Sequence, residues 1–170
     1  MKQTIAITVY NESGVLTRIS TVFSSRGFNI DSIAVGPTEL KGISRIILVL
    51  PADNQKMEQI TKQLNKLIQV IEVKDITLRA CVERELMLIK LKCVPNLRSE
   101  LLEIVKIFRA KVVDLAYNSL TIEIVGDPGK IISIQQLLSA PHLEIVEIVR
   151  TGKIAIERDL GINTELSKIT

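Results

Sequence analysis

The stretch Asn11-Glu-Ser-Gly-Val-Leu-Thr-Arg-Ile19, continued by Arg26-Gly-Phe-Asn-Ile-Asp31, decides the fold of the first half of this chain. Alternating apolar residues before it predict a strand, and an amphipathic helical pattern begins after the polar turn. Gly27 suits the left-handed conformation in which many helices end. The stretch therefore predicts a strand, a turn whose residues 11–13 supply a side-chain cap, a short helix and a second strand.

Outward from this stretch, strands and helices continue in an order that is typical of one known unit. The second strand, over residues 28–35, slips in phase between Ile30 and Ile33, which predicts a β-bulge. Residues 43–50 are almost continuously apolar, as in a central strand, and an amphipathic helix follows. A fourth strand over 70–76 completes β-α-β-β-α-β, the ferredoxin-like unit with both helices on one face of its sheet. The other face carries apolar residues and is expected to need a partner.

The second half of the chain repeats this order of elements. Aligning Arg26-Gly-Phe-Asn-Ile-Asp31 with Arg109-Ala-Lys-Val-Val-Asp114 gives an offset of 83 residues (109 − 26). At this offset the first helices of the two halves also align, which pairs Ser13 with the expected cap Asn96, Ile19 with Leu102 and Val22 with Val105. The agreement indicates an internal repeat.

We therefore predict an α+β fold made of two tandem ferredoxin-like βαββαβ domains. The first domain spans residues 1–78, the second spans residues 79–158, and residues 159–170 form a mobile tail. Residues 77–84, where the domains join, contain no Gly/Ser-rich linker. We expect the two domains to be closely coupled for that reason.

Composition excludes several classes of protein. Of the 170 residues, 46% are hydrophobic and 24% are charged, which is typical of a folded chain. The net charge of +3 is spread out, with no two Lys or Arg adjacent, and aromatic residues make up 3%. Neither a basic patch nor a stacking platform for nucleic acid is expected. No apolar run approaches the roughly 20 residues of a membrane-spanning helix, no targeting peptide is recognisable, and Cys81 and Cys93 are expected to be reduced.

No motif in the sequence places catalytic residues together. The single histidine, His142, has no ligand partner at metal-site spacing, and we interpret it as structural or solvated. Glu83 and Glu85, on either side of an arginine, are interpreted as part of a solvated charge cluster. The run from Asp127 to Gly129 is interpreted as a turn with a helix cap. We expect neither a catalytic nor a metal site.

The turn before the first helix is the exception to this lack of chemistry. The backbone N–H groups of Gly14, Val15 and Leu16 lie where a helix begins. A carboxylate placed there gains from unpaired donors and from the helix dipole. A plain capped turn explains the same residues equally well.

Other residues of the same stretch extend the binding hypothesis. The side-chain carbonyls of Asn11 and Asn29 can accept hydrogen bonds from an ammonium group. An apolar neighbourhood for a small aliphatic side chain comes from Ile30, Ile33 and Val35. A carboxylate, an ammonium and a branched aliphatic group together describe a branched-chain amino acid.

Several runs of the sequence resemble one known family. Asn11-Glu-Ser-Gly-Val-Leu-Thr-Arg-Ile19, the run from Phe23 to Thr38 and Ser44-Arg-Ile46 resemble the ACT domain of acetolactate synthase small (regulatory) subunits. Arg84-Glu-Leu-Met-Leu-Ile-Lys90 and Val149-Arg-Thr-Gly-Lys153 resemble the start and end of the C-terminal domain of that family. The similarity extends to about residue 158.

This resemblance implies a non-catalytic subunit that forms a homodimer through its ACT sheets. It also implies a large catalytic subunit as partner, which would hold thiamine diphosphate, Mg and FAD, while this chain would hold no cofactor. The small subunit would activate the catalytic subunit and confer feedback inhibition by valine, or by leucine or isoleucine. The resemblance places the effector against Asn11, Gly14, Val15 and Leu16 of one protomer and Asn29 and Ile30 of its partner.

The second domain is assigned by the same resemblance to dimer support and to contact with the catalytic subunit. The resemblance places the protein in a bacterial cytoplasm or a plastid stroma. An alternative is an amino-acid-sensing ACT protein that regulates a different enzyme or transcription. A transcription regulator would need a helix-turn-helix with a basic recognition helix, and the sequence offers no such segment.

Overall fold

The computed structural model describes residues 2–159, without the side chains of residues 54–56, so the predicted tail after Asp159 lies outside the described residues. The elements follow in the order β1 (Lys2–Tyr10), α1 (Val15–Ser24), β2 (Ser32–Pro37), β3 (Ile43–Pro51), α2 (Asn54–Leu64), β4 (Val70–Asp75), β5 (Cys81–Lys92), α3 (Arg98–Ile107), β6 (Lys111–Leu115), β7 (Ser119–Gly126), α4 (Pro128–Leu138), β8 (Ile145–Arg150) and β9 (Ile154–Glu157).

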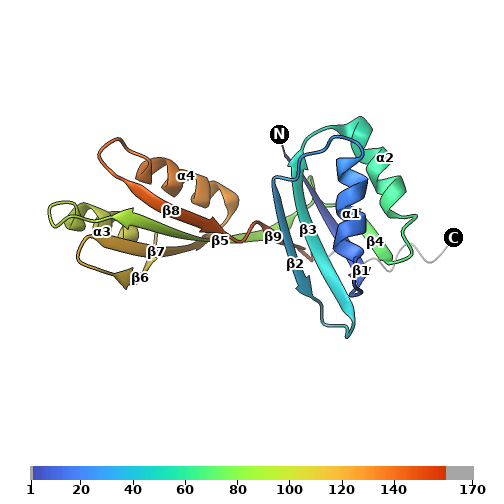
Figure 1. The fold of residues 1–170 in the computed structure, drawn as a ribbon, viewed down its shortest axis with the longest axis horizontal. Coiled ribbons are helices and arrows are strands. Elements are labelled where there is room, and N and C mark those ends of the chain that lie inside the picture. The colour runs from blue at the N-terminus through green and yellow to red at the C-terminus, as the bar shows by residue number, and fades with distance from the viewer. Residues whose placement is uncertain (1, 160–170) are drawn as a thin grey trace.

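These elements build two βαββαβ units that lie end to end (Figure 1). The first has an antiparallel sheet in the order β2-β3-β1-β4, and the second has the order β6-β7-β5-β8. In the first unit α1 and α2 pack on one face of the sheet, and in the second unit α3 and α4 do the same, which gives each unit its own apolar core. The predicted fold class, with two tandem ferredoxin-like domains, is confirmed.

The register of the repeat is 82 residues, not the predicted 83. Ile7 of β1 and Ile89 of β5 take equivalent positions (89 − 7 = 82), and both are fully buried. A register shift follows each of them at the same distance, after Thr8 in the first unit and after Lys90 in the second. The predicted pairing of Ile19 with Leu102 is wrong, because Leu102 is 43% exposed.

The ends of the first helices show the same register. Gly27 has φ 67° and Arg109, 82 residues later, has φ 51°, so both take the left-handed conformation. After α1 the N–H of Phe28 returns to the carbonyl of Phe23, and after α3 the N–H of Ala110 returns to that of Val105. The predicted alignment paired Arg26 with Arg109, and this pairing displaced the repeat by one residue.

The structure tests three of the predicted helix caps, and two of them are wrong. α1 begins after Gly14, whose φ of 84° makes the turn, and no side chain of residues 11–13 caps it. Leu97, not Asn96, precedes α3, again without a side-chain cap. The third prediction is confirmed, because the Asp127 carboxylate accepts a hydrogen bond from the Lys130 N–H at the start of α4.

The second strand begins at Ser32, four residues later than predicted. Residues 25–27 form the turn out of α1. Residues 28–31 form an irregular segment, which joins the sheet through a hydrogen bond from the Asp31 N–H to the Val49 carbonyl at 2.9 Å. β2 pairs with β3 in one continuous register from Ser32 to Pro37. The phase slip that predicted a bulge reflects this irregular entrance to β2.

The last strand, β9, was not predicted. It pairs with the first four residues of β5, and the two form a ribbon that extends from the second unit to the first. β9 shares two surface hollows with the helix-free face of the first sheet, one beside Ala6 and Thr8 and one beside Ile47. The face that was expected to need a partner is therefore covered by the chain's own ribbon, and Ile47 is only 4% exposed.

Within residues 2–159 no helix is both long enough and apolar enough to cross a membrane.

Candidate functional site

The turn between β1 and α1 presents backbone donors without a competing side chain. Gly14 precedes the first helical residue, Val15, and no side chain accepts from the first turn of α1. The turn is fixed to the neighbouring hairpin by the Asn11 N–H, which donates to the Gly42 carbonyl at 2.8 Å. Because no side chain in the described part of the chain caps these amides, the start of α1 can accept a carboxylate from outside.

Side chains around this turn divide between the core and the surface. The side chain of Val15 is buried in the first core. Its backbone N–H makes a long hydrogen bond of 3.4 Å to the Glu12 carbonyl, which a ligand at this turn would have to share or replace. Leu16 is 45% exposed, and Asn11 is exposed as well. The turn thus offers backbone donors, one amide side chain and an apolar surface.

The other predicted site residues lie at the opposite end of α1. Asn29 is exposed, and Ile30 is half-buried against the first core. α1 has 10 residues and is therefore about 15 Å long, which separates Asn29 from Gly14 by roughly that length. Within one chain the structure brings Asn11, Gly14, Val15 and Leu16 together but does not bring Asn29 and Ile30 to them.

The strand that follows Ile30 is an outer strand of its sheet. β2 pairs with β3 on one side only, so its other edge is unpaired within the described chain. Ile33 and Val35 are 37% and 52% exposed along it. An exposed apolar edge strand is well suited to pairing with another strand.

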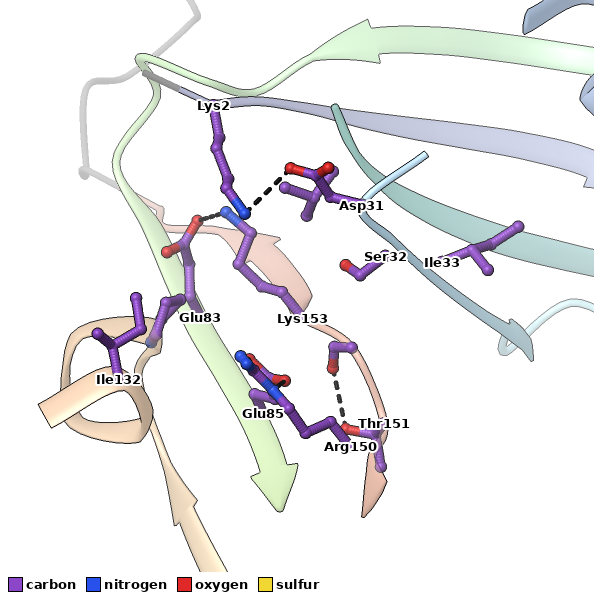
Figure 2. A pocket seen from close by; sticks show the side chains of 13 residues that line it. Lys2, Asp31, Ser32, Ile33, Glu83, Glu85, Ile132, Arg150, Thr151 and Lys153 are labelled. Atoms are coloured by element: carbon purple, nitrogen blue, oxygen red, sulfur yellow. Dashed lines mark hydrogen bonds and ion pairs between the residues drawn. The ribbon is translucent and has the colours of Figure 1, made fainter. Parts of the chain in front are cut away.

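A second group of polar residues lies between the two units, around a cavity of about 470 Å³ (Figure 2). Glu85 was predicted to be solvated, and this is wrong: it is 5% exposed and receives two hydrogen bonds from Arg150, at 2.6 and 3.0 Å. The hydrogen bonds with Glu85 raise the pKa of Arg150, against the opposing effect of burial. Glu83, also predicted to be solvated, accepts from the Lys153 ammonium at 2.6 Å.

The remaining candidate residues show no catalytic arrangement. His142 lies at the surface, 2.8 Å from the Glu100 carboxylate. Among residues 2–159 no group of three or more His, Cys, Asp or Glu is placed to hold a metal. Cys81 and Cys93 are both free thiols. Burial, followed by the charges of Glu157 and Glu83, raises the pKa of Cys81, which makes it a poor nucleophile.

Sequence reasoning missed the group between the units, although a signal for it was present. Arg84-Glu85 and Arg150-Thr-Gly-Lys153 belong to the two runs that resemble the start and end of the family's C-terminal domain, but no contact between them was predicted. The partners are 65 and 70 residues apart, and they meet only because β8 pairs with β5.

Comparisons with known proteins match both halves of the chain. The family profile "AHAS small subunit-like ACT domain" matches residues 5–72, and the profile "Small subunit of acetolactate synthase" matches residues 84–159. A probable acetolactate synthase small subunit from Archaeoglobus fulgidus is 45% identical over 93% of this chain and 98% of its own length. The acetolactate synthase small subunit of Bacillus subtilis is 46% identical over 93% of this chain and 91% of its own.

A longer relative and a solved structure agree. Acetolactate synthase small subunit 2 of Arabidopsis thaliana, a chloroplastic protein, is 47% identical over 93% of this chain, and the match covers 32% of that longer protein. The crystal structure of the acetolactate synthase small subunit from Thermotoga maritima superposes with a TM-score of 0.83 at 35% identity, over 94% of this chain and 98% of that one. The chain belongs to the family of acetolactate synthase small subunits, the regulatory subunits of that enzyme, and carries the family's ACT domain in its first half.

Proposed function

We propose that this chain activates a large catalytic subunit of acetolactate synthase and makes it sensitive to feedback inhibition by valine or a related branched-chain amino acid. The observation that carries the proposal is the division of the candidate site into two halves at opposite ends of α1. Each half lies at the surface of one chain and is incomplete by itself. A second copy of the chain would complete it.

Pairing through the exposed edge of β2 would bring the halves together. If two β2 strands pair in antiparallel fashion, the beginning of one strand lies beside the end of the other. Asn29 and Ile30 precede Ser32, where β2 begins, and the β2–β3 hairpin that follows Pro37 holds Asn11 through the Gly42 carbonyl. The two half-sites would therefore face each other across a two-fold axis.

The chemistry of the two halves fits an amino acid. The carboxylate would accept hydrogen bonds from the amides of Gly14, Val15 and Leu16 at the start of α1. The ammonium would donate to the side-chain carbonyls of Asn11 and Asn29. The aliphatic side chain would lie against Ile30 of the partner subunit. Selectivity among valine, leucine and isoleucine would be modest, because one methylene is worth ~1–3 kcal/mol in an apolar site.

A ligand shared by two protomers can act as a regulator. It shifts the dimer only as far as it binds one interface arrangement more tightly than the other. Coupling of ~1–3 kcal/mol, equal to roughly 5–150-fold in affinity, is ordinary for such systems. The large subunit would supply the thiamine diphosphate, Mg and FAD for the reaction.

The second unit would support the dimer and contact the large subunit. The helix-free face of its sheet carries three exposed apolar residues that lie close together, Leu88, Val125 and Val149. Leu88 of β5 pairs with Val149 of β8. On its other side Leu88 pairs with Glu123 of β7, two residues before Val125. Within residues 2–159 no ribbon covers these positions, in contrast to the first sheet. Exposed apolar surface of this kind is typical of contact sites.

Asn29→His tests the proposed site in the holoenzyme reconstituted with the large subunit. We expect inhibition by valine to be lost while activation of the large subunit remains, because the substitution removes an ammonium acceptor at the surface. Asn65→His, at another exposed position of the first unit, is the control and should keep both properties. Unchanged valine inhibition in the Asn29 variant would show that the site is placed wrongly. The chain alone, incubated with pyruvate, should form no acetolactate.

A further inference from the structure

The short segment Arg150-Thr-Gly-Lys153 joins the two units and contacts the segment that leads out of the proposed effector site. We propose that this segment, the interdomain joint, transmits effector binding in the first unit to the second unit, with Lys153 as its positioning residue. The proposal rests on the proposed function, because it describes how occupancy of that same site is communicated.

The interdomain joint is fixed to the second unit at its first residue. The Arg150 guanidinium donates to both carboxylate oxygens of Glu85 and, at 3.3 Å, to the side-chain carbonyl of Gln135 on α4. The next residue, Thr151, exchanges hydrogen bonds with the backbone of Leu86. A bidentate pair with one nearly buried carboxylate has a fixed geometry. Arg150 therefore moves with the second sheet and α4.

At its last residue the interdomain joint is fixed to the first unit. The Lys153 ammonium donates to the Thr4 hydroxyl of β1 at 2.7 Å and to the Glu83 carboxylate of the ribbon at 2.6 Å. The Lys153 side chain is only 14% exposed, so this charge is held away from solvent. Buried charges depend strongly on their partners. Because Lys153 contacts both β1 and the ribbon, its ammonium group must move whenever β1 moves relative to the ribbon.

Between these two anchors the interdomain joint contacts the start of β2. Gly152 is buried with φ 79°, and a Cβ atom at this position would lie 3.3 Å from the Cβ of Ser32 and 3.4 Å from the Ile33 carbonyl. Ser32 comes two residues after Ile30, which belongs to the proposed effector site. The residue between them, Asp31, is held by Lys2 at 3.0 Å on the same side of the cavity (Figure 2).

The cavity beside the interdomain joint leaves room for movement. One wall comes from residues 31–33, directly after the effector residues, and another from Pro128 and Ile132 of α4. Close-packed interfaces resist gradual deformation, whereas units separated by an open cavity can change their relative angle. A shift of residues 29–32 on effector binding would press on Gly152 and change the angle between the units.

The test compares effector binding with effector response in Lys153→Met, which removes the ammonium but keeps an unbranched side chain. Valine binding to the purified small subunit is measured by calorimetry, and valine inhibition is measured in the reconstituted holoenzyme. We expect the dissociation constant to change by less than about 2-fold while the half-inhibitory valine concentration rises by at least about 5-fold. Lys153→Arg should restore part of the response, because it keeps a cation.

Two matched variants separate transmission from general damage. Lys62→Met removes an exposed lysine that pairs with Glu58 on α2, far from the interdomain joint, and should leave binding and inhibition unchanged. Thr4→Val removes the hydroxyl acceptor of Lys153 without a large change of shape. If the Thr4–Lys153 contact carries the signal, the effects of Thr4→Val and Lys153→Met on inhibition will not add in the double variant.

Three results would overturn the proposal. Full valine inhibition in Lys153→Met would remove the interdomain joint from the mechanism while leaving the proposed function intact. Loss of binding together with inhibition in Lys153→Met would place Lys153 in the effector site or in the fold instead. Absence of amino-acid binding by the unsubstituted chain would overturn the proposed function, and the interdomain joint would then have nothing to transmit.

Discussion

The two βαββαβ units have separate but equivalent cores and differ at their surfaces. In both, a fully buried isoleucine lies on the first strand of the unit, at Ile7 and Ile89, and a residue with positive φ follows the first helix, at Gly27 and Arg109. The helix-free face of the first sheet is covered by the β5–β9 ribbon, whereas the second sheet leaves Leu88 exposed on that face. The shared features specify the fold, and the unshared ones are where we place function.

The two units also differ in the loops that connect their strands. The first unit has five residues between β2 and β3 (38–42), and their Gly42 holds the turn at Asn11, whereas the second has three between β6 and β7 (116–118). The first helices of the two units, α1 and α3, both begin without a side-chain cap, whereas α4 has Asp127. The uncapped helix start and the longer hairpin lie together at the candidate site.

The largest expected effect comes from emptying the equivalent centres of the two cores. Ile7→Ala and Ile89→Ala should each lower the free energy of unfolding by ~2–5 kcal/mol, because each leaves a cavity among fully buried neighbours. Chemical denaturation measures the loss, and hydrogen exchange locates it. If the cores are independent, Ile7→Ala will lower protection mainly in the first sheet and Ile89→Ala mainly in the second.

The surface isoleucine Ile68 provides a control for this pair. It is 89% exposed, so Ile68→Ala should change stability by less than about 0.5 kcal/mol. Equal loss of protection in both sheets from either core substitution would contradict the comparison. The ribbon and the interdomain joint would then bind the two units into one cooperative structure.

Local patterns predicted most of the fold, because each unit is specified by alternation in its strands and by helical periodicity. Met87, Ile89 and Leu91, for example, stand at alternate positions of β5, and all three are buried. β9 escaped prediction because it has only four residues and pairs with a segment 70 to 76 positions earlier, from Cys81 to Arg84. Short strands that depend on distant partners leave little periodic signal.

The candidate site was predictable only in part, for a related reason. The turn at Gly14 was recognisable from its small residues, but the absence of a side-chain cap depends on the φ of 84° that the turn adopts. The burial of Glu85 depends on Arg150, which lies 65 residues away. The charges along one strand do not show which of its side chains a segment much later in the sequence will bury.

Gly27 and Arg109, the left-handed residues that follow α1 and α3, allow a test in which two substitutions should change stability in opposite directions. Gly27→Arg should cost ~1–2 kcal/mol, because a side chain is disfavoured at φ 67°, although its Cβ would meet nothing within 4 Å. Arg109→Gly should stabilise by about 1 kcal/mol or less, since relief of the same strain is partly offset by the entropy of glycine. Chemical denaturation of both variants gives the two values. Effects of the same sign would show that the two positions are not equivalent.

The smallest expected effect concerns the start of α4, where Asp127 supplies a side-chain cap. Asp127→Ala removes the acceptor of the Lys130 N–H and should lower the melting temperature at pH 7 by roughly a few degrees. Asp127→Asn keeps an acceptor and should leave it nearly unchanged. The same substitutions at Ser13, which caps nothing in α1, should have no such effect.

The pH dependence of this cap has a definite sign. The hydrogen bond from the Lys130 backbone holds the pKa of Asp127 below its ordinary value of 3.8. A carboxylate with a lowered pKa in the folded state stabilises the fold fully above the unfolded pKa, and this contribution is lost as the pH falls through the lower folded value. Thermal unfolding between about pH 5 and pH 2 should therefore show the difference between the native chain and Asp127→Ala shrinking with acid. A difference that grows on acidification would mean that the Asp127 carboxylate does not cap α4. The contrast between the capped start of α4 and the uncapped starts of α1 and α3 would then fail.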